Sequence, residues 1–143
     1  MDIEIDPDKS RLQLEVIHRF LAGSYWSKGI PMDIVRRAIE GSICFGAYDG
    51  PRQVGFARVV TDGATFAYLA DVFVMESHRG RGLASRLMEA VTAHPQLQGL
   101  RRWILATRDA HGLYARHGFT PLAAPERFME RHDPDIYLHP ARK

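Results

Sequence analysis

The chain has 143 residues, of which 45% are hydrophobic, and this size and composition predict one globular domain spanning residues 1–143. Its 19 basic and 17 acidic residues leave a formal net charge of +2, too small a surplus to indicate nucleic acid as a partner. No signal peptide pattern opens the chain, and no run of about 18 apolar residues could span a bilayer. We therefore expect a soluble, cytoplasmic protein in which the single cysteine, Cys44, is a buried and inert thiol.

Two amphipathic helices are predicted first. Asp8 and Ser10 can cap the first of them. Its apolar residues recur at helical spacing and are Leu12, Val16, Ile17, Phe20 and Leu21. After the glycine-containing stretch "GSYWSKGIP", Pro31 is placed to open a second helix that ends at Gly41. The apolar face of this second helix consists of Ile34, Val35, Ala38 and Ile39.

Three strand-like runs follow, at residues 43–48, 53–60 and 66–75. The turn signals "DGPR" and "TDGA" separate them and predict an antiparallel meander. The third run leads through "ESHRGRG" into a predicted helix over residues 82–93, and "RRWILAT" at 101–107 is a further strand. A strand, glycine-rich turn, helix and strand in succession are typical of a crossover between parallel strands, so we expect a mixed sheet.

The last part of the chain gives weaker signals. Asp109 can cap a short helix that runs to about His117, and Gly118 can end it. "FTPL" then continues in extended conformation, and "DIYL" at residues 135–138 is a final strand candidate.

The stretch "HRGRGLAS", residues 78–85, joins the third strand to the next helix and is suited to bind an anion. Amide N–H groups at a helix N-terminus lack acceptors and lie at the positive end of the helix dipole. Gly80 and Gly82 allow a ligand to approach the backbone, and Arg79 and Arg81 add charge, so phosphate is the expected ligand.

The turn allows three other interpretations. A Walker loop requires Gly-Lys-Ser/Thr, whereas Leu83 follows Gly82, and we reject it. A dinucleotide fingerprint would use Gly80, Gly82 and Ser85, but a meander precedes the turn, which argues against it. A solvated surface loop with two arginines stays open on the turn alone.

The same residues resemble the acetyl-CoA-binding core of the GNAT N-acetyltransferase superfamily. The family pattern Gln/Arg-x-x-Gly-x-Gly/Ala matches Arg79, Gly82 and Ala84 in "RGRGLA", and a valine, Val74, lies five residues before the arginine. Farther on, "YARHGF" carries the family's Tyr-x-x-x-Gly-Phe core, with Tyr114 as its tyrosine. The resemblance covers residues 43–122 well and the last 20 residues weakly. Glu76 and Asp109 depart from the family, which often has proline and asparagine there.

The resemblance implies an α/β (α+β) fold of the GNAT type, with a mixed, mostly antiparallel sheet of six to seven strands and about four helices. It also implies acetyl-CoA as co-substrate, no metal, direct attack of an amine on the thioester, and the pairing into dimers that small members often show. The implied cofactor-binding residues are Phe73, Val74, Arg79, Gly80, Arg81, Gly82, Leu83, Ala84 and Asp109. Phe73 and Val74 would act through their main chains beside a bulge where two strands separate, with Val74 donating towards the thioester oxygen.

Tyr114 is the predicted general acid, since a phenol of pKa near 10 can protonate a departing thiolate. The base is less determined: Asp71, Glu76 and His111 are candidates, and Asp71 comes first because an unpaired carboxylate in "YLADVFV" would be costly. On the acceptor side, Tyr25 and Trp26 are predicted to bind substrate, with Lys28 and Phe128 nearby. A Trp26 side chain that merely anchors its loop is an equal alternative.

The leading hypothesis is therefore an N-acetyltransferase acting on a primary amine of a small molecule. A protein amine is the nearest variant, and a non-catalytic acyl-CoA-binding sensor is a second class. A nucleic-acid binder would need more aromatic side chains among its basic residues than Tyr68 and Phe73 provide. We expect no membrane partner.

Overall fold

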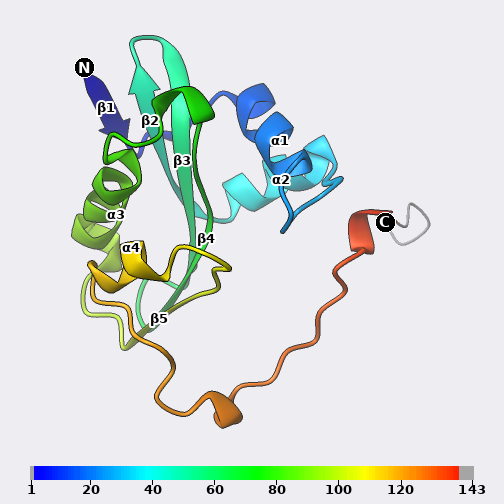
Figure 1. Ribbon diagram of the computed structural model, residues 1–143, viewed down its shortest axis with the longest axis vertical. Helices are drawn as coiled ribbons and strands as arrows, with labels where there is room; N and C mark the ends of the chain where they lie inside the picture. The colour runs from blue at the N-terminus through cyan, green and yellow to red at the C-terminus, as the bar shows by residue number, and fades with distance from the viewer. Residues whose placement is uncertain (1, 139–143) are drawn as a thin grey trace.

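The computed structural model describes residues 2–138 and contains a mixed β-sheet (Figure 1). Its strands, in spatial order, are β1 (Ile3–Asp6), β2 (Ile43–Asp49), β3 (Arg52–Thr61), β4 (Phe66–Val74) and β5 (Arg102–Leu105). β1 to β4 pair antiparallel with their neighbours, whereas β5 pairs parallel with β4. The predicted meander and the predicted crossover are therefore confirmed. Within residues 2–138 the sheet has five strands, fewer than the expected six to seven.

Helices cover both faces of the sheet. They are α1 (Leu14–Ala22), α2 (Met32–Glu40), α3 (Leu83–Ala93) and α4 (His111–Ala115). On β2, Cys44 packs with residues of α1 and α2, whereas its neighbour Phe45 packs with residues of α3. Alternate side chains of the central strands thus enter two apolar clusters, one on each face. Cys44 is buried, as predicted.

The beginning of the chain differs from the prediction in two ways. Asp8 does accept a hydrogen bond from the Ser10 N–H at 2.9 Å, but this pair caps a single 3-10 turn. The first helix, α1, begins only at Leu14, and Leu12 lies ahead of it in extended backbone. The strand β1 was not predicted, because four residues of alternating Ile and acid carry a weak signal until they pair with β2.

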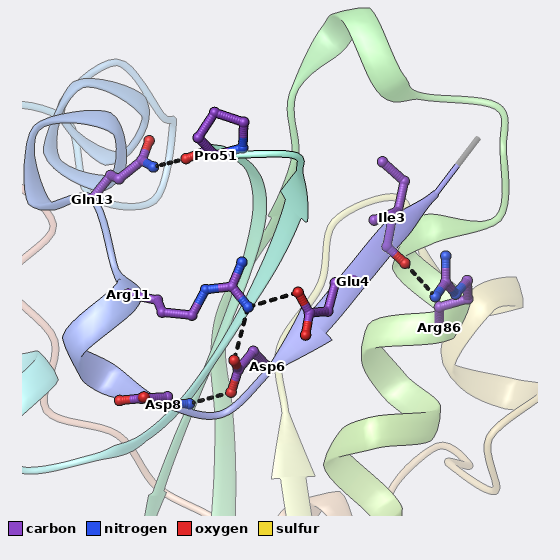
Figure 2. Close-up of polar contacts among 8 residues, drawn as sticks. All are labelled: Ile3, Glu4, Asp6, Asp8, Arg11, Gln13, Pro51 and Arg86. Carbon is purple, nitrogen blue, oxygen red and sulfur yellow. Dashed lines mark hydrogen bonds and ion pairs between the residues drawn. The ribbon is translucent and has the colours of Figure 1, made fainter.

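Polar side chains fasten β1 to its surroundings (Figure 2). The Arg11 guanidinium donates to Glu4 and to Asp6, each at 2.8 Å. On the other side, Arg86 of α3 donates to the Ile3 carbonyl at 2.7 Å. The short edge strand is therefore held from both sides, although exposed ion pairs contribute little individually.

The elements after α3 are shorter than predicted. The helix predicted from Asp109 to His117 is α4, and the Ala110 N–H ahead of it donates to the Thr107 hydroxyl at 3.0 Å rather than to Asp109. Gly118, with φ +90°, follows α4 and ends it as predicted. The strand predicted at 135–138 is wrong, because this segment forms the 3-10 turn Ile136–Leu138. After α4 the chain first passes beside β5, where Phe119 contacts Trp103, and then leaves the sheet in a wide arc (Figure 1). Within residues 2–138 it adds no strand to the sheet.

Candidate active site

The turn between β4 and α3 forms an open cradle. Gly80 and Gly82 both have φ +75°, and a Cβ atom on either residue would meet no other atom within 4 Å. Gly82 is the N-cap of α3 and offers no side-chain acceptor to the first turn. The Leu83 and Ala84 N–H groups open the helix and therefore have no intrahelical acceptor. The free N–H groups and the open space beside the two glycines fit a pyrophosphate at this helix N-terminus.

The two arginines of the turn differ in their surroundings. The Arg79 Nε donates to the Val74 carbonyl at 3.0 Å, so this side chain folds back along β4 and ties the turn to the strand. Both residues are exposed, and Arg81 lies on the turn between the two glycines. Arg79 therefore fixes the cradle, and Arg81 lies at its surface.

β4 and β5 pair over only part of β4. The paired residues of β4 are Phe66–Leu69, and beyond Leu69 no pairing with β5 occurs. There the register between β3 and β4 shifts and β4 gains one residue, a β-bulge. Asp71 in this bulge has φ +55°, the only positive φ of a non-glycine residue within residues 2–138. The bulge and the separation of strands that the family resemblance implied are both present.

The Val74 main chain faces the gap between β4 and β5. The Met75 N–H donates to the Val54 carbonyl of β3 at 2.8 Å. In a planar peptide the C=O and N–H point in opposite directions, so the Val74 carbonyl points away from β3. It accepts the Arg79 bond on that side. Val74 thus presents main-chain polar groups at an unpaired strand edge.

Phe73 has a different orientation. Its carbonyl lies on the β3 side, where a Cβ atom on Gly55 would approach it to 3.3 Å. Its ring stacks on Phe20 of α1 with centroids 4.0 Å apart and also contacts Phe56 at 5.7 Å. The side-chain packing expected of Phe73 is therefore observed, while its main chain is turned to the neighbouring strand rather than to the gap.

Tyr114 on α4 is buried in the same apolar cluster as Val74 and Leu83. Its ring makes an edge contact with Phe119, with centroids 6.0 Å apart. Burial raises the pKa of Tyr114, and Tyr25 and Asp109 raise it further by smaller amounts. The phenol therefore keeps its proton at pH values where a free thiol of pKa near 8.5 ionises, which suits a proton donor.

Asp71 has the partners that its position in the sequence required. Arg58 Nε donates to one carboxylate oxygen at 2.8 Å, and the Trp26 Nε1–H donates to the other at 2.8 Å. The Asp71 side chain is only 9% exposed, so the Arg58 charge compensates a nearly buried carboxylate. Arg58 also donates to the Ser42 hydroxyl at 3.1 Å, which ties the network to the end of α2.

A small cavity of about 70 Å³ lies beside this network. Asp71 and Arg58 line it, and its other walls come mainly from apolar side chains of α1 and α2, with Tyr137 from the tail. Asp71 and Arg58 neutralise each other, so the recess carries little net charge and suits a compact, largely apolar group.

The loop between α1 and α2 reaches across to the segment after β5. The Arg108 guanidinium lies 3.8 Å from the Tyr25 ring centroid, and Tyr25 makes an edge contact with Trp26 at 5.1 Å. Tyr25 is 52% exposed and Trp26 is 40% exposed. Trp26 thus anchors the loop through Asp71, as the alternative interpretation of this residue expects. Its ring is partly exposed, and substrate binding by Tyr25 and Trp26 stays a prediction.

The remaining predicted residues are more scattered. Glu76, Asp109 and His111 are exposed, and so is Lys28. Phe128 lies beside β5 instead, under the Arg102 guanidinium at 4.9 Å. The structure therefore does not bring Phe128 to the Tyr25 and Trp26 loop.

Sequence reasoning missed two polar residues of the site. Arg58 is the ion-pair partner of Asp71, and its lone charge in the apolar run 53–60 was an available signal. His78 is 5% exposed and binds Asp49. That contact joins residues 29 positions apart, and no local pattern reveals it.

A mixed sheet that divides beside a glycine-rich helix N-terminus, with a tyrosine on the following helix, defines a class of acyl-group transferase. The protein-family model described as "Acetyltransferase (GNAT) domain" matches residues 40–121, more than half of the chain. The protein belongs to the GNAT acetyltransferase family.

Individual relatives agree with this assignment. A crystal structure of a Xanthomonas campestris pv. campestris protein, described as a GNAT-family member, is 55% identical, with TM-score 0.93 over 96% of this chain and 97% of that one. A curated Gibberella zeae protein, provisionally named as an acetyltransferase, is 33% identical and aligns over 81% of this chain and 77% of its own length. A Staphylococcus aureus structure, 20% identical, has TM-score 0.75 over 92% and 99% of the two chains, which shows a shared fold.

Proposed function

We propose that this acetyltransferase transfers an acetyl group from acetyl-CoA to a primary amine of a small molecule. The observation that carries the proposal is the common location of three features. Leu83 at the glycine cradle, Val74 on the part of β4 that does not pair with β5, and buried Tyr114 all belong to one apolar cluster. Acetyl transfer from acetyl-CoA requires a binding site for its diphosphate, a strand edge that can hold the thioester end, and a proton donor for the leaving thiolate.

Acetyl-CoA supplies a thioester, which is an acetyl group activated for attack by an amine. Residues Arg79 to Ala84 would bind the pyrophosphate through their amides, and Arg81 would add charge. Val74 would hold the thioester end with its main chain, and Phe73 would support that strand by packing. Asp109, exposed ahead of α4, would contact the pantetheine arm.

Tyr114 acts as the general acid in this proposal. Its phenol stays protonated because burial raises its pKa, and it donates that proton to the departing thiolate. Asp71 is the general base in this proposal: its carboxylate takes a proton from the acceptor's ammonium group, directly or through water, and the resulting neutral amine attacks the thioester. Its two oxygens each accept one bond, from Trp26 and Arg58, and each retains a further lone pair for the amine.

The acceptor would enter on the side of Tyr25 and Trp26. The cavity of about 70 Å³ beside Asp71 is lined by other residues than these two aromatic side chains, and its small size favours a compact amine over a folded protein surface. A flexible protein terminus or lysine side chain is the nearest variant.

Release of CoA thiol, measured over a panel of small amines, amino acids and peptides, tests the proposal, and Tyr114→Phe is the control. We expect turnover with small amines that falls sharply in the variant. Tight acetyl-CoA binding without turnover on any amine would indicate an acyl-CoA sensor instead. Salt-sensitive oligonucleotide binding without affinity for CoA would contradict the enzyme.

Compartment and assembly belong to the same proposal. Burial raises the pKa of the free Cys44 thiol to about 11, which fits an unreactive cysteine in a reducing cytoplasm. No helix in the described part of the chain has the length and apolarity to cross a membrane. We further infer that two copies of the chain pair through the part of the sheet near β5, where Val60 of β3 and Phe66 and Tyr68 of β4 are exposed.

A further inference from the structure

His78 opens the glycine–arginine turn, and its ring is engaged on both sides. It is only 5% exposed, with Nε2 at 2.8 Å from an Asp49 carboxylate oxygen and Nδ1 at 2.7 Å from the Ser77 hydroxyl. A neutral ring that donates from Nε2 to Asp49 and accepts from Ser77 satisfies both nitrogens. Because both ring nitrogens are engaged within the protein, His78 contributes to the phosphate cradle by holding it and not by contacting a ligand.

Asp49 gives this contact a fixed anchor point. It is the last residue of β2 and is paired with Ile3 of β1 on one side and Arg52 of β3 on the other. The bond from His78 therefore joins the turn to the middle of a three-strand arrangement. The second fixed point of the turn is the Arg79 bond to Val74 on β4.

The cradle needs such anchors because its own backbone supplies few. Gly80 and Gly82 stand free, with nothing within 4 Å of where their Cβ atoms would be. Glycine backbones lose more conformational freedom on ordering than other residues. A turn of this kind presents its amides to a ligand in one arrangement only if neighbouring side chains hold it.

The charge on Asp49 supports the same conclusion. A hydrogen bond from His78, together with weaker attraction from Arg52 and Arg81, lowers the pKa of Asp49, so the carboxylate is ionised at neutral pH. A negative charge near a pyrophosphate-binding site opposes binding of that ligand. The Asp49 carboxylate is therefore explained better as a hydrogen-bond acceptor that holds His78 in place than as a group that contacts the ligand.

We propose that His78 and Asp49 are positioning residues that hold the turn 79–82 in its pyrophosphate-binding shape. This inference depends on the proposed use of acetyl-CoA. It predicts an effect on affinity for the diphosphate part of the ligand, with little effect on the chemistry at Tyr114 or on acceptor binding.

Calorimetric titration with acetyl-CoA and with S-acetylpantetheine, which lacks the pyrophosphate, tests the proposal. His78→Leu should raise the Kd for acetyl-CoA about tenfold, the size expected when a hydrogen bond to a charged group is lost. Its Kd for S-acetylpantetheine should stay unchanged. His78→Gln, whose amide nitrogen can replace Nε2 as the donor, should restore most of the affinity.

Asp49 gives a matched pair of variants. Asp49→Asn keeps an oxygen acceptor for His78 and removes the charge, so the Kd for acetyl-CoA should stay the same or fall. Asp49→Ala removes the acceptor and should weaken binding as His78→Leu does. With an amine acceptor in hand, both weakened variants should show a raised KM for acetyl-CoA at nearly unchanged kcat.

Backbone ¹⁵N order parameters at residues 79–83 separate this inference from the proposed function. Lower order parameters in folded His78→Leu, restored in His78→Gln, are expected without any ligand. Unchanged order parameters, or equal losses of affinity for the two ligands, would overturn the positioning role. Failure of the wild-type protein to bind acetyl-CoA would overturn the proposed function, while the order parameters would still decide whether His78 holds the turn.

Discussion

At the scale of single residues, the Tyr114 hydroxyl has the clearest chemical assignment. Tyr114→Phe keeps the ring that packs against Phe119 and removes the proton. We expect kcat to fall about a hundredfold, within the usual range for general acid catalysis. Because burial raises the pKa of Tyr114, the wild-type rate should lose this contribution only at pH values above the ordinary phenol range, as the proton is lost. A pH–rate profile checks both points: an identical alkaline limb in the variant would exclude Tyr114 as the acid.

Asp71 can serve as a base or as an anchor for Trp26, and substitution separates the two. Asp71→Asn keeps an oxygen acceptor of similar shape, yet it cannot accept a proton from an amine. A base predicts a loss in kcat of about a hundredfold that a more alkaline assay pH partly relieves, since more of the amine is then neutral. An anchor predicts a lowered melting temperature with little change in kcat. Arg58→Gln, which leaves the carboxylate without its cation, is the comparison for stability.

The Tyr48 hydroxyl is buried without a hydrogen-bond partner in the described part of the chain. Tyr48→Phe should therefore raise the free energy of unfolding by about 1 kcal/mol, measured by urea denaturation. Burial raises the pKa of Tyr48 to about 12, so the unfolded chain loses this proton first and stability falls as the pH rises above about 10. The Phe variant should lose that part of the alkaline sensitivity. Tyr68→Phe, at an exposed position, should change neither quantity.

At the scale of elements, the start of α3 depends on left-handed backbone at Gly82. Gly82→Ala puts a Cβ in open space, so its cost is the backbone strain of φ +75°, about 1–2 kcal/mol. The N-cap should relax out of this conformation and turn the amides away from the ligand, which raises the Kd for acetyl-CoA. Gly99→Ala is a matched control, because Gly99 has φ +73° and equally open surroundings away from the turn. It should lower stability by a similar amount and leave the Kd unchanged.

The elements also show what a sequence can reveal. The meander and α3 carry local signals, namely turn residues and helical spacing, and the phosphate turn follows from two glycines before a helix. The bulge at Asp71 has no local signal in the sequence. Leu69 and Val74 both pack on the α3 side of the sheet, although one position is odd and the other even. This happens because β4 pairs with β3 on both sides of one extra residue. The orientation of Phe73 follows from this extra residue. Contacts such as Trp26 with Asp71 appear only once the sheet has assembled.

At the scale of the molecule, the two ends of the sheet are covered differently. α1 and α2 lie over one end, and the segment after α4 leaves the other end and returns towards α1 and α2 only at its tip (Figure 1). Exposed apolar side chains occur on both the uncovered sheet and the returning segment. They are Val60, Phe66 and Tyr68 on the sheet, and Leu122, Phe128 and Met129 on the segment.

These surfaces underlie the homodimer proposed above. Met129 is 98% exposed, and β5 is an edge strand with one paired side. An apolar edge and an apolar extended segment on one chain are complementary, so two copies can cover each other symmetrically.

Light scattering coupled to gel filtration should give twice the mass of one chain for the wild-type protein. Phe66→Lys places a charge on the exposed sheet and should shift the mass towards that of a single chain, with an unchanged far-ultraviolet circular dichroism spectrum. Asp33→Lys on the exposed side of α2 is the control and should remain dimeric. A single-chain mass for the wild-type protein at every concentration tested would contradict the dimer, and acetyl-CoA binding by a folded Phe66→Lys monomer would show that each copy carries a complete cofactor site.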